Sequence, residues 1–506
     1  MPDLAVTVLE ACVRHRDRVA LLDALGRPTT FGALRSRVLA VASGLRRRGL
    51  EPGDRVLFAV PPSPSSFALA LGVVTAGGTL AFADPRAGDA VLAARAAALA
   101  PRWALAASPV YALAGRVWRS LGDVTHVYTG PRLPGVPCGA FSWRRVCQRS
   151  ALTDAQRPYR DFDQGRCGDA GAPALVIPTS GTTAAPRLVV HSRASLGAGL
   201  AAFAARVPFG PGDVVHTDQL MIGLPALAGG ATWSLPAPGA RPSRLARVLR
   251  GRGATHTFCV PADVDAVARG GPLPPGVRGI LLGAAPVLPG PLRRLRSVAP
   301  NADLLAVYGM TELAPAAVAT AEEKIAHTDA GAPGDLLGTP LPGVTARVAD
   351  DGELCFSAPH QALGYLDLGD RSTDTDAECP QRHFAGTPEI ASGDLGRVLD
   401  DGRIVLTGRR KDMIIRGDRN IYPGLYEAAV TALPGVREAL LVGVPTPAGD
   451  EHVVLAVAGD RPDAGTVRRV FGVDAPDEVV VLDDLPRGGR SRKPDRGALR
   501  ALLARR

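Results

Sequence analysis

Lysine is almost absent from this chain of 506 residues, and aromatic residues make up only 5% of it. Three lysines stand among 58 basic residues, against 49 acidic residues, so arginine carries the net charge of +9. Proteins that bind nucleic acids concentrate positive charge beside aromatic side chains that stack on bases. Here the arginines are scattered singly or in short groups, as at residues 46–48. The composition therefore argues against nucleic-acid binding, although the charge would attract anionic substrates.

Cysteine pairing and membrane insertion have equally little support. The seven cysteines are widely spaced and no Cys-x-x-Cys pair occurs, which argues against a zinc ribbon or a disulfide framework. No basic stretch followed by an apolar run marks the start of the chain as a signal peptide. The longest uncharged stretch, residues 56–83, contains three prolines near its start and is otherwise short for a membrane span. We therefore expect a cytoplasmic protein with reduced thiols and no membrane span.

The distribution of apolar residues predicts an α/β fold up to about residue 310. Residues 30–45 predict an amphipathic helix that begins at Thr30, because apolar residues recur there at helical spacing. Residues 56–60 and 79–83 are short apolar runs bounded by turns, which is typical of buried strands. Helices and strands that alternate in this way indicate a largely parallel sheet.

The pattern changes twice in the second part of the chain. From about residue 330, short strands separated by glycine and aspartate turns predict a small β-rich subdomain. After residue 410, one helix and three strands predict a compact α+β domain. We therefore expect a large N-terminal domain over residues 1–410, made of α/β subdomains and the β-rich subdomain. A smaller C-terminal domain is expected over residues 411–506.

Four polar segments contain groups suited to binding a nucleotide: residues 179–187, 308–312, 392–396 and 485–493. The first is a Gly/Ser/Thr loop that ends in Arg187, so it offers a polyphosphate backbone N–H groups, hydroxyls and a cation. The second ends in a glutamate, whose hard oxygen suits Mg²⁺. The third offers an aspartate at what we expect to be a strand-end turn, where it can accept both hydroxyls of a ribose. Each segment alone is also compatible with an ordinary turn, strand end or basic loop.

Taken in this order, the four segments resemble the adenylate-forming superfamily, which includes acyl-CoA synthetases, peptide-synthetase adenylation domains and firefly-type luciferases. The resemblance covers nearly the whole chain, from Thr29 to Lys493, and includes a Gly-Arg-Arg-Lys-Asp hinge at residues 408–412. Two of the three lysines, Lys411 in the hinge and Lys493 in the last segment, fall where this superfamily has a lysine. The resemblance implies that the C-terminal domain is mobile and turns about the hinge between two half-reactions.

The activity that the resemblance implies is that of an acyl-CoA ligase. Such an enzyme joins a carboxylic acid to the α-phosphate of Mg²⁺-bound ATP, releases pyrophosphate, and passes the acyl group to the thiol of coenzyme A. The resemblance also implies a set of residues that bind ATP or coenzyme A: Thr179, Ser180, Gly181, Thr182, Thr183, Arg187, Gly283, Ala284, Ala285, Tyr308, Gly309, Met310, Thr311, Asp394, Arg409 and Gly417.

Within this set, the resemblance implies individual roles. Residues 179–183 would cradle the β- and γ-phosphates, and residues 283–285 would form a wall beside the adenine and the acyl chain. Tyr308 would pack against the adenine. Asp394 would bind the ribose with help from Arg409.

Other matched residues would take part in the chemistry or in the second half-reaction. Thr311 would contact the α-phosphate and Glu312 would hold Mg²⁺. Lys493 would reach the attacking carboxylate and the α-phosphate, where a point cation can follow the developing negative charge. Gly417 belongs to the turn that lines the pantetheine tunnel in relatives, and Asp418 could narrow that tunnel.

The segments also depart from the superfamily pattern. The changes on the adenylation half are Ala184, Arg187, Leu188, Gly488 and Arg492, where relatives keep glycine, lysine, glycine, threonine and glycine. Because Arg492 directly precedes Lys493, its bulk could misplace the lysine, and a small misplacement can cost about 100-fold in rate. By the number of changes, adenylation is therefore the half-reaction more in question, and the alternative is that these are tolerated substitutions.

The acyl site has a weaker signature in the sequence. His216 lies where relatives keep an aromatic–histidine gate, and it is our candidate for that gate. Asp218 lies near the position at which peptide-synthetase domains hold an α-amino group. The small and apolar residues around both positions favour a hydrophobic acid over an amino acid.

Three alternatives stay open beside the acyl-CoA ligase. The protein could thioesterify only an acyl-adenylate made by a partner ligase, or it could pass the acyl group to the thiol of a carrier protein. It could also bind nucleotides or acyl-adenylates without catalysis, although Lys493, Glu312 and Asp394 argue against that. A hydrolase is disfavoured because neither a Gly-x-Ser-x-Gly elbow nor a His-Glu-x-x-His motif occurs.

Overall fold

The computed structural model describes residues 3–83, 89–113, 117–118, 121–147, 169–179, 187–366, 389–416, 419–446, 451–488 and 492–505. The chain divides into two compact units, which are described one at a time. The first comprises Met1–Pro238, Thr311–Ala314 and Pro359–Pro388, and the second comprises Gly239–Met310, Pro315–Ala358 and Glu389–Arg506.

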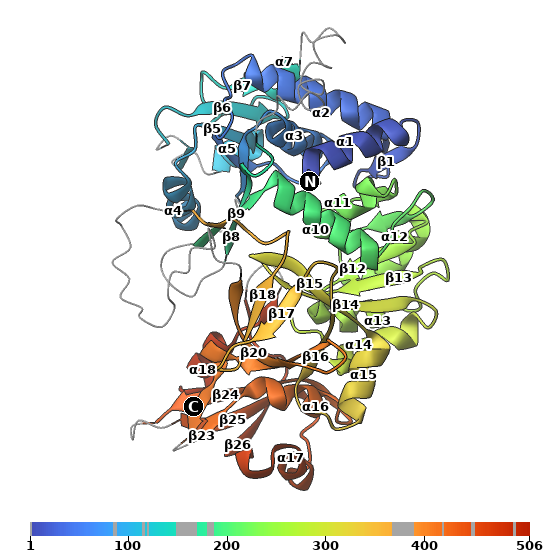
Figure 1. Cartoon of the computed structure of the whole chain (residues 1–506), viewed down its shortest axis with the longest axis vertical. Helices are drawn as coiled ribbons and strands as arrows, with labels where there is room; N and C mark the ends of the chain where they lie inside the picture. The colour runs from blue at the N-terminus through green and yellow to red at the C-terminus, as the bar shows by residue number, and fades with distance from the viewer. Residues whose placement is uncertain are drawn as a thin grey trace. The chain divides into compact units, whose positions relative to one another are not determined.

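The first unit is built on an eight-stranded sheet (Figure 1). In spatial order its strands are β19 (Gly364–Tyr365), β9 (Arg187–Ser192), β8 (Pro173–Thr179), β4 (Thr79–Phe82), β3 (Arg55–Ala59), β5 (Trp103–Ala107), β6 (Thr125–Thr129) and β7 (Phe141–Ser142). The strands pair in parallel except at β9, which runs antiparallel to both β8 and β19. Four shorter strands pair with one another: β1 (Val19–Leu22), β2 (Pro28–Thr30), β10 (Val214–His216) and β11 (Thr232–Ser234).

Helices connect and cover these strands. They are α1 (Leu4–Arg14), α2 (Phe31–Arg46), α3 (Pro64–Thr75), α4 (Asp89–Leu99), α5 (Ser108–Leu113), α7 (Trp143–Cys147), α10 (Arg193–Arg206) and α11 (Leu220–Ala228). The helix predicted at residues 30–45 is α2, and Thr30 caps it by accepting the N–H of Ala33 at 3.2 Å. Its apolar face is buried against α3, where Gly72 permits close contact because a Cβ there would lie 2.4 Å from Val41.

The second unit contains a mixed sheet with parallel and antiparallel parts. Its parallel part is β12 (His256–Cys259), β13 (Gly279–Leu282) and β14 (Asp303–Met310). The antiparallel part is β15 (Leu313–Thr320), β16 (Asp335–Pro340), β17 (Thr345–Val348), β18 (Glu353–Ser357), β20 (Ile390–Val398) and β21 (Ile404–Arg409). The helices of this part are α12 (Leu245–Arg252), α13 (Val264–Arg269), α14 (Pro289–Val298) and α15 (Ala321–Asp329). The antiparallel strands β16, β17, β18, β20 and β21 confirm the β-rich region predicted from residue 330.

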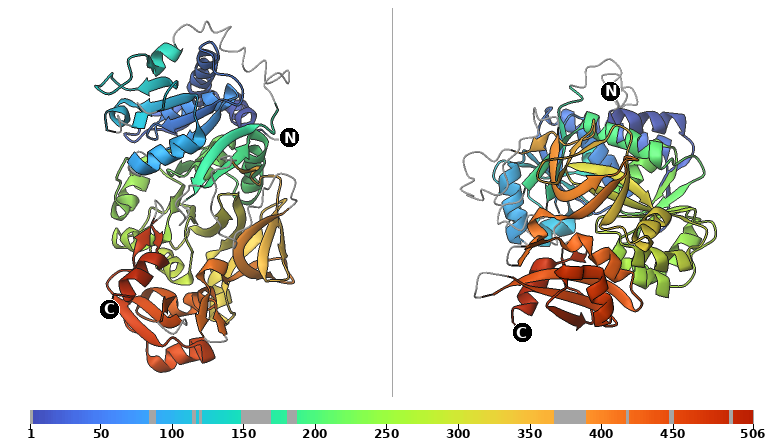
Figure 2. Two further views of the ribbon diagram at one scale, coloured as in Figure 1. Left: turned by 90° about the vertical axis from the view of Figure 1, so that its left-hand side faces the viewer. Right: turned by 60° about the horizontal axis from the view of Figure 1, so that its bottom comes forward.

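The C-terminal part of the second unit contains a sheet of three strands with helices on both faces (Figure 2). The strands are β24 (Val436–Pro445), β25 (Glu451–Gly459) and β26 (Glu478–Leu482). Alternate residues of β24 point to opposite faces: Leu441 packs with α16 (Glu427–Thr431) and α17 (Ala464–Phe471), while Leu440 packs with α18 (Arg496–Leu503). Two small ribbons complete it, β22 (Ile414–Arg416) with β23 (Arg419–Ile421) and β27 (Arg487–Gly488) with β28 (Lys493–Pro494).

The α/β fold class predicted from the sequence is confirmed by this arrangement. The predicted boundary between residues 410 and 411 lies inside the second unit, and the predicted movement of the C-terminal domain stays a prediction.

Among the described residues, no helix combines the length and the apolar character that a membrane span needs. The five described cysteines are free thiols. The third lysine, Lys324, is buried and forms an ion pair with Asp335.

Candidate active site

A polar cluster of the second unit surrounds the carboxylate of Asp394. This residue lies in β20, opposite Arg409 of β21, and only 5% of its surface is exposed. Its Oδ2 accepts the hydroxyl of Tyr308 at 2.7 Å, and its Oδ1 lies 2.9 Å from Nε of Arg409. A carboxylate has about four lone-pair positions. The two donors therefore fix the direction of the carboxylate while leaving positions at which it can accept two hydroxyl groups.

The turn predicted at residues 392–394 is wrong, because these residues belong to strand β20. Gly393 has a φ of 73°, a conformation that glycine adopts without strain, and the ladder with the neighbouring strands is irregular here. The N–H of Gly393 donates to Oε1 of Glu353 at 2.7 Å. The side chain of Ser392 accepts the N–H of Asp394 at 3.1 Å. A side-chain acceptor thus replaces a strand-to-strand bond, which allows the strand to bend without ending.

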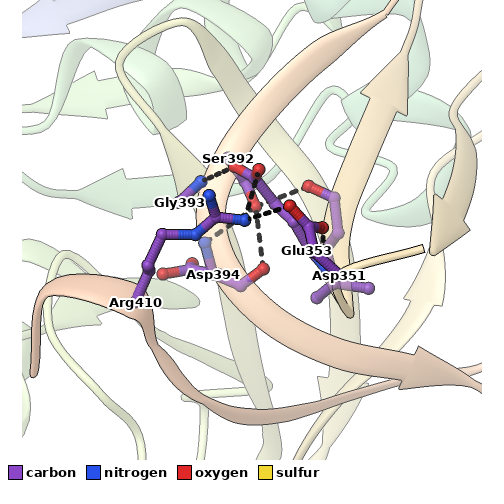
Figure 3. Close-up of polar contacts among 7 residues, drawn as sticks. Asp351, Glu353, Ser392, Gly393, Asp394 and Arg410 are labelled. Carbon is purple, nitrogen blue, oxygen red and sulfur yellow. Dashed lines mark hydrogen bonds and ion pairs between the residues drawn. The ribbon is translucent and has the colours of Figure 1, made fainter. Parts of the chain in front are cut away.

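Arg410 lies against this irregular stretch (Figure 3). One guanidinium nitrogen is 3.1 Å from Oε2 of Glu353 and 2.6 Å from Oδ2 of Asp351. Asp351 is exposed, and the hydrogen bond from Arg410 is the main cause that holds the pKa of its carboxyl below its usual value. Glu353 is buried and contacts both Arg410 and Gly393. The sequence carries no local signal for this network, because its members come from the turn before β18 (Asp351), from β18 and β20, and from the predicted hinge segment.

Lys493 belongs to the same neighbourhood as Asp394. It lies in β28, opposite Gly488, and its side chain still contacts solvent. Partial burial is the main cause that lowers its pKa, and Arg409 and Lys411 lower the pKa further, while Asp394 opposes them. Such coupling requires these charges to lie close together. The structure thus brings together four residues that the sequence analysis singled out: Asp394, Arg409, Lys411 and Lys493.

Arg492 has an unusual backbone for its residue type. Its φ is 52°, which glycine adopts freely and other residues adopt at a cost. Its guanidinium forms an ion pair with Asp263. The glycine that the superfamily pattern keeps before the lysine would suit this conformation, so an arginine here introduces strain beside Lys493.

Tyr308 lies near the end of β14, which continues through Gly309 to Met310. Burial is the main cause that raises the pKa of the Tyr308 hydroxyl, and Asp394 raises it further. The hydroxyl therefore remains protonated and acts as a donor.

In the predicted adenine wall, Gly283 has tight surroundings: a Cβ there would lie 3.0 Å from the carbonyl oxygen of Val307.

The other two wall residues differ from Gly283. Ala284 has a φ of 62°, which is strained for a residue with a Cβ. Ala285 follows it in the segment between β13 and α14.

A second cluster lies in the first unit, around Glu312. Its Oε1 accepts the hydroxyl of Tyr365 at 2.7 Å. The guanidinium of Arg187 lies over the ring of Tyr365, 5.9 Å from its centre. Nearby, the backbone oxygen of Thr311 is 2.8 Å from Nε2 of the buried His191. Tyr365, which the sequence analysis did not predict, therefore connects the arginine of the predicted phosphate loop with the predicted metal ligand.

The structure describes only some of the remaining predicted residues. Thr179 ends β8 and lies opposite Arg187 of β9. Ser180, Gly181, Thr182, Thr183 and Gly417 lie outside the described residues. His216 lies in β10 and is buried, with Nδ1 3.1 Å from the hydroxyl of Ser234. Asp218 is exposed and bonds to the side chain of Gln219. The gate role of His216 stays a prediction.

The donor set is compatible with Mg²⁺ bound together with a nucleotide. In the described part of the chain, no three His, Cys, Asp or Glu side chains gather as a metal site. Mg²⁺ keeps several waters and usually takes one or two carboxylates together with substrate phosphates. Within the described residues, Oε2 of Glu312 has no hydrogen-bond partner, so one carboxylate oxygen faces no competing donor.

Comparisons with known proteins agree with this geometry. The family model described as "AMP-binding enzyme" matches residues 8–366. The chain is 27% identical to a salicyl-AMP ligase / salicyl-S-ArCP synthetase of Mycobacterium tuberculosis, over 95% of this chain and 87% of that one. It is 28% identical to a feruloyl-CoA synthase of an Amycolatopsis species, over 92% of both. Among solved structures, the amide bond synthetase McbA of Marinactinospora thermotolerans covers 99% of both chains, with a TM-score of 0.82 and 24% identity.

Proposed function

The chain belongs to the AMP-binding enzymes of the adenylate-forming superfamily, and we propose that it is an acyl-CoA ligase for a hydrophobic carboxylic acid. The observation that carries the proposal is the cluster of Tyr308, Asp394, Arg409 and Lys493. It combines a fixed acceptor for ribose hydroxyls with cations that suit a phosphate. Similarity to a feruloyl-CoA synthase over 92% of both chains supports coenzyme A as the acceptor.

In the proposed first half-reaction, the chain's residues orient ATP and the acid. Asp394 accepts the ribose hydroxyls and Tyr308 packs on the adenine. Lys493 lies beside the α-phosphate, where one carboxylate oxygen forms a bond to phosphorus. The bond from phosphorus to the β-phosphate oxygen breaks, and pyrophosphate leaves. Mg²⁺, when bound at Glu312, supplies charge neutralisation for the leaving group.

In the proposed second half-reaction, a thiol attacks the carbonyl carbon of the acyl-adenylate. The carbon–oxygen bond to AMP breaks, and AMP leaves with the electron pair. The C-terminal domain turns about Lys411 between the two steps, and Gly417 lines the path of the pantetheine arm. His216 gates the acyl pocket. The small and apolar residues near His216 favour a hydrophobic acid.

A carrier-protein thiol is the second candidate acceptor. It is favoured by the similarity to the salicyl-AMP ligase / salicyl-S-ArCP synthetase of Mycobacterium tuberculosis, which extends over 95% of this chain. An amine is a third acceptor to include in the test, because an amide bond synthetase shares the fold of this chain.

The test combines two acyl donors with three acceptors. A panel of hydrophobic acids is supplied either as free acid with ATP and Mg²⁺ or as the preformed acyl-adenylate. Coenzyme A, a carrier protein bearing phosphopantetheine, and a simple amine serve as acceptors, and products are measured by mass. Thioester with coenzyme A from both donors is the expected result. Product from the adenylate alone would mean that adenylation is lost, and no acyl-CoA from either donor would refute the proposal.

A further inference from the structure

The carboxylate of Glu353 is buried yet bonded on both sides. Its Oε1 accepts the N–H of Gly393, and its Oε2 pairs with Arg410 (Figure 3). A buried carboxylate is costly unless both oxygens have donors, so this side chain has a defined orientation. Gly393 directly precedes Asp394, whereas Arg410 directly precedes Lys411. One side chain therefore joins the strand that carries the ribose acceptor to the segment that leads into the hinge.

The neighbouring residues Arg409 and Arg410 contact different carboxylates. Arg409 ends β21 and contacts the carboxylate of Asp394. Arg410 begins the short helical turn Arg410–Asp412 and contacts Glu353 and Asp351. Arg409 still has an extended backbone, whereas Arg410 already belongs to the helical turn, and the two arginines reach different carboxylates. The end of β21 is thus fixed at two points directly before the hinge.

We propose that Glu353 is a positioning residue that couples the hinge segment to the ribose-binding carboxylate of Asp394. The proposal rests on the proposed function, because it takes Asp394 as the ribose acceptor. Through Gly393, Glu353 sets the backbone that directs Asp394, and through Arg410 it keeps the end of β21 in place. The C-terminal domain then turns about a point beyond Arg410 without disturbing the nucleotide site.

The substitution Glu353→Gln tests this coupling. Glutamine keeps the size and the acceptor for the N–H of Gly393 but loses the charge that pairs with Arg410. Asp351→Asn is the matched control, because it removes an ion pair with the same arginine nitrogen while leaving Gly393 untouched. We expect Glu353→Gln to weaken ATP binding about tenfold. Asp351 is exposed, so its variant should stay within about twofold of the unmodified protein.

A ribose-specific measurement separates positioning from a merely structural role. Dissociation constants for ATP and for 2′,3′-dideoxy-ATP are compared by calorimetry in the full chain. The unmodified protein should prefer ATP because Asp394 binds the hydroxyls. Glu353→Gln should lose most of that preference, whereas Asp351→Asn should retain it. A preference equal in Glu353→Gln and in the unmodified protein would overturn the proposal.

Arg410→Met provides an independent variant on the other side of the pair. It keeps an apolar stem of similar length and should reduce the preference for ATP in the same direction. The double variant should be no worse than the more affected single variant, because both changes remove one coupling. Additive effects, or loss of the fold in both single variants, would overturn the proposal. Failure of the proposed function looks different: the unmodified protein would then bind ATP and dideoxy-ATP equally or not at all.

Discussion

The carboxylates of Asp394 and Glu312 are held in contrasting ways. Asp394, in the second unit, has a donor on each oxygen, from Tyr308 and from Arg409. Glu312, in the first unit, has one oxygen bonded to Tyr365, and the described residues place no donor at the other. The first arrangement fixes a direction for accepting hydroxyl groups, whereas the second leaves an oxygen for a cation.

This contrast follows the chemistry of the two proposed ligands. A ribose offers two directional hydroxyl donors, so a carboxylate that is already oriented loses little entropy on binding them. Mg²⁺ brings its own waters and phosphate ligands, so it needs only one well-placed oxygen from the protein. Changes in the cluster around Asp394 should therefore have larger effects than changes around Glu312.

The largest effect is expected from Lys493→Ala. The variant removes the cation that we propose lies beside the reacting phosphate, and loss of one such preorganised contact costs about 10²- to 10³-fold in rate. Exchange of pyrophosphate into ATP should fall by this amount for an accepted acid. Thioester formation from the preformed acyl-adenylate should be retained, which provides the internal control. An unchanged exchange rate would show that Lys493 is not the catalytic lysine.

The pH dependence of adenylation gives a second measure of the same cluster. Burial, Arg409 and Lys411 lower the pKa of Lys493 from the ordinary value of 10.5, so its positive charge is lost at a lower pH than in free lysine. Adenylation should therefore decline as the pH rises through that lowered value. Lys411→Gln removes one neighbouring charge and should move this decline to higher pH. A decline at the same pH in both proteins would contradict the coupling.

How much of this could be predicted from the sequence differs between the two clusters. Tyr308, Asp394, Arg409 and Lys493 lie in short motifs, so the resemblance to the superfamily pattern singled them out from the sequence, and their roles stay predictions. The strand-end turn at residues 392–394 was wrong because a side chain from a strand 40 residues away supplies the bond that bends β20. Local patterns cannot reveal such a partner.

The partner of Glu312 illustrates the same limit. Tyr365 lies 53 residues further along the chain, in a two-residue strand that pairs with β9. Neither periodicity nor a motif predicts that pairing, since a strand this short has no recognisable alternation. The α/β fold class was predictable because periodic apolar runs such as residues 30–45 and 56–60 extend over whole helices and strands. The donors that orient the site depend on tertiary contacts between distant segments.

A moderate effect is expected from Tyr365→Phe. Loss of a hydrogen bond to a charged group costs about 1.5–3 kcal/mol when the acceptor is buried, and Glu312 is only half-buried, so we expect a loss of about tenfold. The readout is the affinity for ATP with and without Mg²⁺. Only the affinity measured with Mg²⁺ should fall.

Tyr426→Phe serves as the matched control for that variant. The hydroxyl of Tyr426 also donates to a carboxylate, that of Asp474, and the residue is also half-buried. Its loss should leave the affinity for Mg²⁺-bound ATP unchanged. Equal effects of the two variants would mean that Tyr365 has no specific relation to the metal.

The smallest effect is expected from Arg492→Gly, where two changes oppose each other. A positive φ costs a residue with a Cβ about 1–2 kcal/mol, and glycine removes that cost. The exposed ion pair with Asp263, which glycine would lose, is worth about 0–1 kcal/mol. Unfolding should therefore require slightly more free energy in the variant, and pyrophosphate exchange should rise by a few-fold at most.

Two further variants separate strain from the ion pair at Arg492. Asp263→Asn removes the charge partner and keeps the strained backbone, so it should not stabilise the protein or raise the exchange rate. Ala100→Gly relieves a positive φ elsewhere and should affect stability alone. If Arg492→Gly slows exchange while Asp263→Asn slows it equally, the ion pair positions Lys493. In that case the arginine contributes to catalysis, and the departure from the superfamily pattern does not impair adenylation.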